Sequence, residues 1–245
     1  MALIKGNAGE STRQLSEKMY FKRVVYVIAS ICGVAFLIFL MFMPNFKNLG
    51  ILGIVVVFVI VKIIMNRVDK KEKQFIKLEK RANIGAVAEE KIGQLLQQLP
   101  QDYAVFHDVV SPYGNIDHVI LHKKNIVFLI ETKSHSGEVT FDNNKLLVNG
   151  KIPEKDFIQQ VLNNLFWLRN KIKEHLSVEL YINPVLVFTK AFVKIPKPIK
   201  GVYVMNKKFL VNHLEEKVKK IHTQKDVNDT PTLFLFLGKL QSNNN

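Results

Sequence analysis

The chain has 245 residues, of which 35 are lysine or arginine and 21 are aspartate or glutamate, giving a formal net charge of +14. A hydrophobic fraction of 48%, with only 12 glycines and 8 prolines, excludes a disordered or collagen-like chain. The single cysteine, Cys32, excludes an internal disulfide, a cysteine-rich zinc site and CxxC redox chemistry.

Two apolar runs near the N-terminus have the length of membrane helices. Residues 24–43 carry no charge and are long enough, at ~1.5 Å per residue, to cross ~30 Å of hydrocarbon. After a connector at 44–48, residues 49–65 contain a single charge, Lys62, close to their end. The sequence therefore predicts a two-helix transmembrane hairpin over 24–65. One span followed by a buried core helix is the alternative.

The charges that flank this hairpin predict its orientation. Lys22 and Arg23 precede the first run, and further basic residues follow the second one between positions 67 and 73. Because Lys and Arg favour the cytoplasmic side, we expect a multi-pass protein of the cell membrane with both termini in the cytoplasm. A cleaved signal peptide fits poorly, since a second span would follow it.

The same reasoning divides the N-terminal part of the chain. Residues 1–23 would form a cytoplasmic N-terminal segment. Residues 66–81 would form a charged juxtamembrane linker, which either rests on anionic lipid headgroups or is simply solvated.

From residue 82 to residue 245 the pattern becomes that of an α/β domain, with a mixed central sheet flanked by helices. Periodicity predicts helices over 84–99, 155–176 and 207–221. It predicts strands over 103–110, 116–122, 126–132, 184–189, 202–205 and 232–237. The second and third strands are separated by 123–125, a connection typical of a β-hairpin.

This predicted hairpin brings charged side chains together. If its turn is centred on Lys124, Asp117 faces Glu131 across the two strands. Strand alternation then places Lys133 on the same side as Glu131. Opposed carboxylates repel each other and destabilise a sheet, so this arrangement needs a compensating cation.

A divalent cation suits the pair. Mg²⁺ and Mn²⁺ prefer carboxylate oxygens, and such an ion acidifies a water and stabilises charge on a phosphoryl group. The Lys133 ammonium would position that water or neutralise the developing charge. Together these groups predict hydrolysis of a phosphodiester. The alternative is that they are charged residues at the exposed ends of two strands, since a bulge would destroy the inferred register.

These residues also resemble a known family. The stretch Asp117-His118-Val119, followed by Ile130-Glu131-Thr132-Lys133 and then Gly137, looks like the nuclease-related (NERD) domain, a branch of the PD-(D/E)XK nuclease superfamily. The helix start Gly85-x-x-Ala88-Glu89 is similar to that family's Gly-x-x-Gly-Glu motif, with alanine in place of the second glycine. The resemblance covers residues 84–188 and implies the fold of that superfamily.

The resemblance further implies roles for individual residues. Asp117 and Glu131 would bind Mg²⁺ or Mn²⁺, and Glu89 would complete or orient the shell of that metal. Lys133 would be the catalytic lysine, and Gln160, on the helix after the hairpin, would be an accessory group. Glu90 is a rival for Glu89, but Glu89 lies nearer the apolar stripe of its helix and has the motif's glycine spacing.

The sequence thus predicts a membrane-anchored, metal-dependent nuclease that acts on nucleic acid, DNA rather than RNA, at the cytoplasmic face of the lipid bilayer. The alternative is a catalytically inactive module with a nuclease-like fold, tethered to the membrane, that binds nucleic acid or a protein. A third hypothesis makes the anchor itself the functional element, in an envelope assembly.

Two further groups of residues have less specific interpretations. The histidines at 107, 118, 122 and 135 are predicted to be structural rather than zinc ligands, because His118 and His122 fall on the strand face opposite Asp117. Six lysines follow the later strands and either contact phosphates nonspecifically or form a solvated positive surface. They are Lys190, Lys194, Lys197, Lys200, Lys207 and Lys208.

Overall fold

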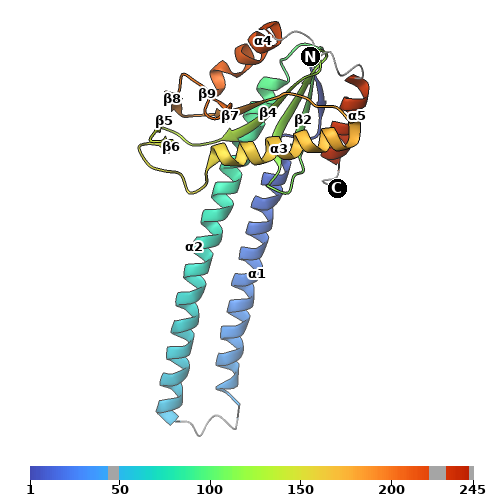
Figure 1. Ribbon diagram of the computed structural model, residues 1–245. Helices are drawn as coiled ribbons and strands as arrows, with labels where there is room; N and C mark the ends of the chain where they lie inside the picture. The colour runs from blue at the N-terminus through green and yellow to red at the C-terminus, as the bar shows by residue number, and fades with distance from the viewer. Residues whose placement is uncertain (44–49, 221–229, 243–245) are drawn as a thin grey trace. The chain divides into compact units, whose positions relative to one another are not determined.

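The computed structural model describes residues 1–43, 50–220 and 230–242, with Leu52 described by its backbone alone. The chain divides into two compact units (Figure 1). One unit joins Met1–Ser11 to Ile84–Asn245, and the other is Thr12–Asn83. The predicted connector at 44–48 lies outside the described residues.

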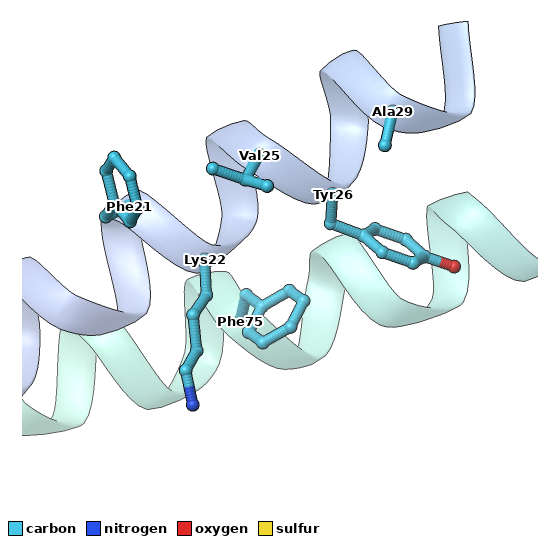
Figure 2. Close-up of a pocket in the computed structure, with 6 residues that line it drawn as sticks. All are labelled: Phe21, Lys22, Val25, Tyr26, Ala29 and Phe75. Carbon is cyan, nitrogen blue, oxygen red and sulfur yellow. The ribbon is translucent and has the colours of Figure 1, made fainter. Parts of the chain in front are cut away.

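The unit Thr12–Asn83 is built from two long helices that run side by side, α1 (Glu10–Leu40) and α2 (Gly50–Leu96). The Tyr26 and Phe75 rings meet edge to face, with their centroids 6.1 Å apart. Nearby, Arg23 Nη1 lies 3.1 Å from Glu79 Oε2. Figure 2 shows a shallow apolar pocket here, in which Phe75 of α2 faces side chains of α1. Aromatic packing and an ion pair therefore join the N-terminal half of α1 to the charged middle of α2.

These helices correct the prediction of two spans. Among the residues that the structure describes, one helix, α1, is long and apolar enough to cross a membrane, and near the N-terminus such a helix also fits a signal sequence. The second predicted span begins at residue 49, outside the described part, and its remainder runs without a break into the charged stretch 66–81. Lys71 of that stretch lies over the Tyr26 ring, so the charged stretch lies beside the start of the first apolar run.

The α/β prediction for the remainder is confirmed: the other unit is a mixed sheet flanked by helices. Its larger described sheet has the strand order β1-β2-β3-β4-β7-β9. Strands β2, β3 and β4 are antiparallel neighbours, whereas β4, β7 and β9 are parallel. The bounds are β1 (Leu3–Lys5), β2 (Tyr103–Val109), β3 (Ile116–His122), β4 (Ile126–Lys133), β7 (Ile182–Phe188) and β9 (Tyr203–Asn206).

Helices cover both faces of this sheet. Helices α3 (Phe157–Leu176) and α5 (Thr230–Ser242) pack on the face that carries Val119 and Leu129. The C-terminal part of α2 and helix α4 (Leu210–Lys220) pack on the face that carries Ile120 and Phe128. A short 3-10 helix, η2 (Lys207–Phe209), leads from β9 into α4. The buried strands therefore separate two hydrophobic cores, which fixes the face toward which each side chain points.

Several predicted elements differ from the observed ones. The stretch 232–237, predicted as a strand, is part of α5, because Leu233, Phe236 and Leu237 bury one face at helical spacing. The predicted helix over 207–221 is η2 followed by α4, and residue 221 lies outside the described residues. A second described sheet, not predicted from the sequence, has the order β6-β5-β8. Its strands are β5 (Glu138–Asp142), β6 (Lys145–Val148) and β8 (Phe192–Val193).

The first residues of the chain belong to the α/β unit, although residues 1–23 were predicted as a separate segment. Strand β1 pairs in parallel with β2. The Ser11 N–H donates to Asp108 Oδ2 at 2.8 Å, and the Ser11 hydroxyl donates to Oδ1, which caps the start of α1. Gly9, with φ +75°, leaves no room for a Cβ, which would lie 2.8 Å from the Ala86 carbonyl oxygen. The N-terminus is thus packed against β2 and α2.

A buried pair of histidines joins β2 to β3. His107 Nδ1 and His118 Nδ1 are 2.8 Å apart, so one ring donates to the other. Burial lowers the pKa of His107 to about 4, and burial also lowers the pKa of His118 well below its ordinary value. Both rings are therefore neutral in the folded domain at pH 7, which agrees with the structural role predicted for them.

This pair predicts a loss of stability in mild acid. Unfolding releases His107 to bind a proton below about pH 6.5, so the free energy of unfolding falls as the pH drops toward 4. Between pH 7 and pH 5 the loss from this one group should be roughly 2 kcal/mol. In His107→Gln the fall should be smaller by that amount, measured by urea unfolding of the full chain in detergent with Trp167 fluorescence.

Asp117, whose pKa is raised, contributes with the opposite sign, but it does so in both proteins, so the difference between them reports on the histidine pair. An equal pH dependence in the two proteins would contradict the assignment.

Candidate active site

The β3–β4 hairpin has the predicted register. His118 pairs with Ile130, Ile120 with Phe128, and His122 with Ile126. Continued by one residue, this register places Asp117 across from Glu131. Because Val119 and Leu129 face α3, alternation turns Asp117, Glu131 and Lys133 toward α3 as well.

The Glu131 carboxylate is held from two sides. Lys133 Nζ lies 2.6 Å from Glu131 Oε1, and Gln160 Nε2 of α3 donates to the same oxygen at 2.6 Å. Gln160 Oε1 accepts from Lys133 Nζ at 3.1 Å, which closes a triangle of three side chains. The second oxygen, Glu131 Oε2, is buried and has no hydrogen-bond partner among the described residues. One carboxylate oxygen is thus fixed while the other remains available.

Asp117 completes the carboxylate pair. The Thr132 N–H donates to Asp117 Oδ2 at 2.6 Å, which fixes this carboxyl group against β4 and leaves Oδ1 out of the bond. Burial raises the pKa of Asp117 well above its usual value, and the negative charges of Glu131 and Glu89 raise it further. Lys133 and the Thr132 N–H oppose that rise without cancelling it. The pair therefore has the electrostatic surroundings of a cation site.

Glu89 reaches the same site from α2. Its side chain is 8% exposed, whereas Glu90 is only half-buried. The charge of Glu89 acts on the pKa of Asp117, which places the two carboxylates near each other. All five predicted site residues are thus brought together, four of them by direct contacts or register and Glu89 by its electrostatic effect. Their catalytic roles remain predictions.

The residues present suit Mg²⁺ or Mn²⁺ in the chemistry of their donors. No group of three or more His, Cys, Asp or Glu side chains with the geometry of a metal site occurs in the described part of the chain. Two buried carboxylates, Asp117 with its raised pKa and Glu131 with an Oε2 that has no partner among the described residues, nonetheless match hard cations, which take few protein ligands and keep several waters. Glu131 Oε2 and Asp117 Oδ1 are the atoms that would face such an ion.

The structure adds Phe157 to this site, which sequence reasoning placed only in the apolar face of a helix. Lys133 Nζ lies 4.9 Å from the Phe157 ring centroid, and the His135 ring packs on the same ring at 5.1 Å. The aromatic ring and Gln160 therefore both contact the ammonium and hold it in place. The signal in the sequence is the spacing of three residues between Phe157 and Gln160, which puts them on one helical face.

A second buried polar contact lies one helical turn beyond Gln160. Asn164 is fully buried, and Ser111 Oγ lies 2.6 Å from Asn164 Oδ1. Ser111 also contacts the Gly114 carbonyl at 2.7 Å. The contact attaches the turn before β3 to helix α3. It therefore helps to position β3, the strand that contains Asp117. Nothing in the hydrophobic pattern of the sequence signals this pair.

The comparison with protein families supports a nuclease-related interpretation of this part of the chain. The model of the nuclease-related domain (NERD) matches residues 84–189. This range contains all five predicted site residues together with β2 to β7 and α3, while β9, α4 and α5 lie beyond it. The comparisons with curated proteins and with solved structures gave no match.

Removal of one negative charge from the pair should stabilise the domain when no metal is bound. Asp117→Asn keeps an oxygen that accepts from Thr132 but removes the repulsion with Glu131. In EDTA its unfolding temperature should rise by a few degrees, or about 1 kcal/mol. Mg²⁺ or Mn²⁺ should then stabilise the wild type but not the variant. Thermal unfolding followed by Trp167 fluorescence measures both effects.

The control for this experiment is Asp142→Asn, which alters an exposed carboxylate at the end of β5 and should change neither result. Equal stabilisation of wild type and Asp117→Asn by the metal would show that Asp117 is not a ligand.

Proposed function

We propose that the chain is a Mg²⁺- or Mn²⁺-dependent nuclease that hydrolyses phosphodiester bonds in DNA. The observation that carries the proposal is the state of Glu131: two donors fix Oε1, while Oε2 is buried and has no hydrogen-bond partner in the described part of the chain. A buried carboxylate oxygen without a hydrogen-bond partner destabilises the fold, so a role in packing does not explain it. The match to the nuclease-related domain supports the same function.

Asp117 and Glu131 would hold the metal through Oδ1 and Oε2. A bound Mg²⁺ or Mn²⁺ supplies a more acidic water and stabilises negative charge on the phosphoryl group. Gln160 keeps Glu131 in one rotamer by donating to Oε1. The Thr132 backbone N–H keeps Asp117 in place in the same way. Both carboxylates are thus oriented before substrate arrives, which is the preorganisation that such catalysis requires.

Lys133 has the position of the catalytic cation. Its side chain is 15% exposed at the carboxyl end of β4, so its ammonium is largely but not completely shielded from bulk water. Phe157 and Gln160 fix its direction. In the proposed reaction Lys133 stabilises the charge that develops on the phosphate oxygens and orients the attacking water. Glu89, buried beside Asp117, orients the surroundings of the metal.

Two substitutions test the proposal while preserving shape. Glu131→Gln retains the length of the side chain but loses the charge, and Lys133→Met retains the aliphatic chain over Phe157 but loses the ammonium. Each should lower the rate of metal-dependent cleavage of labelled DNA by about 100-fold or more. The matched controls Glu174→Gln and Lys145→Met change exposed side chains and should cut at the wild-type rate.

Cleavage by the two site variants at the wild-type rate would contradict the proposal. A wild-type chain that binds nucleic acid but cuts nothing with any metal would instead establish the binding module as the function.

We further propose that α1 attaches the domain to a membrane. None of the residues of α1 is buried, so its apolar surface has no cover within the described chain. Tyr26, Phe75, Arg23 and Lys71 gather where the apolar part ends, as aromatic and basic side chains do at a membrane surface. A cleaved signal sequence is disfavoured because cleavage after α1 would remove β1 from the folded sheet.

Cys32, in the apolar run of α1, reports on this attachment directly. In proteoliposomes it should react at least roughly tenfold more slowly with a membrane-impermeant maleimide than after addition of detergent, because the bilayer covers it. Gln98→Cys in a Cys32→Ser background gives the control, since residue 98 is exposed in the α/β unit. Equal labelling of Cys32 in intact and dissolved vesicles would place α1 outside the bilayer.

A further inference from the structure

The positive charge of the α/β unit is concentrated in one short stretch, residues 189–209. Residues 82–245 contain 21 Lys and Arg against 16 Asp and Glu, a net charge of +5. Residues 189–209 contain six lysines and no acidic residue, so the remaining residues have 15 basic against 16 acidic side chains and a net charge of −1. The surplus that could attract a polyanion therefore lies in this stretch.

The sheet topology brings this stretch to the candidate active site. Strands β4, β7 and β9 are parallel, and the register places Lys133, Phe188 and Asn206 in one row across their carboxyl ends. With neighbouring strands about 4.8 Å apart, Asn206 lies roughly 10 Å from Lys133. Lys190 follows this row after β7, and Lys207 follows it after β9. Lys190 and Lys207 thus lie within two residues of the row that contains Lys133.

The lysines are available to a ligand. Five of the six are exposed, and Lys207 is half-buried. Among the described residues, one ion pair involves the stretch, between Lys194 Nζ and Glu138 Oε2 at 2.6 Å. The other five lysines therefore keep charges that no acidic side chain of the described chain neutralises.

Two exposed phenylalanines lie among these lysines. Phe192 in β8 is 65% exposed, and Phe209 at the end of η2 is 62% exposed. Strands β8 and β9 are in contact (Figure 1), and Asn206 Nδ2 donates to the Ala191 carbonyl at 2.6 Å, which joins the two segments. Lys194 Nζ lies 5.9 Å from the Phe192 ring centroid. Proteins that bind single-stranded nucleic acids have such a surface: unpaired bases stack on the aromatic rings, and the phosphates contact the basic side chains.

We infer that residues 189–209 bind single-stranded DNA, with Phe192 and Phe209 as stacking platforms beside the candidate active site. The inference rests on the proposed function and names its substrate class: strands with unpaired bases. Duplex DNA keeps its bases stacked inside the helix, so it would gain the lysine contacts but not the stacking on the two rings.

The experiment measures binding apart from cleavage. The full chain in detergent, with EDTA to prevent metal-dependent cutting, is titrated against labelled oligo-dT about a dozen nucleotides long and against a duplex of the same length, by fluorescence anisotropy. One variant is Phe192→Ser with Phe209→Ser, and a second is Lys207→Gln with Lys208→Gln. The controls are Phe166→Ser, which removes an exposed ring from α3, and Lys219→Gln with Lys239→Gln, which removes two exposed charges elsewhere.

The wild type should bind the single strand more tightly than the duplex. Loss of the two phenylalanines should weaken single-strand binding by about tenfold or more and duplex binding by less than about twofold. Loss of Lys207 and Lys208 should weaken both and lower the salt dependence of single-strand binding by about 1.4 in slope. Both control variants should bind as the wild type does.

Unchanged single-strand binding in the phenylalanine variant, or tighter binding of the duplex by the wild type, would overturn the inference. Neither result depends on catalysis, because cleavage by the same wild-type preparation is assayed separately with Mg²⁺ or Mn²⁺. Cleavage without stacking-dependent binding refutes only this inference. Stacking-dependent binding without cleavage refutes only the proposed reaction.

Discussion

The repulsion between two buried carboxylates, Asp117 and Glu131, is the constraint around which the candidate site is arranged. The hairpin places them opposite each other, and burial makes their charges expensive. Lys133 and Gln160 donate hydrogen bonds to one oxygen of Glu131, and the Thr132 N–H donates to one oxygen of Asp117. The remaining oxygens, Glu131 Oε2 and Asp117 Oδ1, are those that the proposed cation would meet. The sheet tolerates this arrangement because hydrophobic cores on both of its faces hold β3 and β4 in register.

The central part of the site was predictable because it depends on local rules. A turn at 123–125 fixes the hairpin register, and alternation along a strand then fixes the side of each residue, so Asp117, Glu131 and Lys133 follow from spacing alone. Glu89 was assigned through the resemblance and preferred to Glu90 by its angle on the helix, and it is buried. Gln160 was assigned through a resemblance, and its contacts with Glu131 and Lys133 are geometric facts that no periodicity predicts.

The features that were missed depend on contacts between distant parts of the chain. Strand β1 has three residues, too few to show alternation, and pairs with a strand that begins at Tyr103. The stretch 232–237 has an apolar run typical of a strand, yet it forms a helix because three of its side chains fill the core beside α3. Phe192 was missed for a similar reason, since β8 has only two residues and pairs with β5. Its stacking role is inferred from exposure.

The N-terminal segment joins the start of α1 to the strands of the candidate site. The pairs His107–His118 and Val109–Ile116 flank Asp108 and Asp117, so the residue that caps α1 lies next to a proposed metal ligand on the neighbouring strand. Asp108 has φ +55°, a strained conformation for a residue with a side chain, and it accepts two hydrogen bonds from Ser11. Loss of the first eleven residues would remove those donors together with β1. The start of α1 is therefore part of the scaffold that positions Asp117.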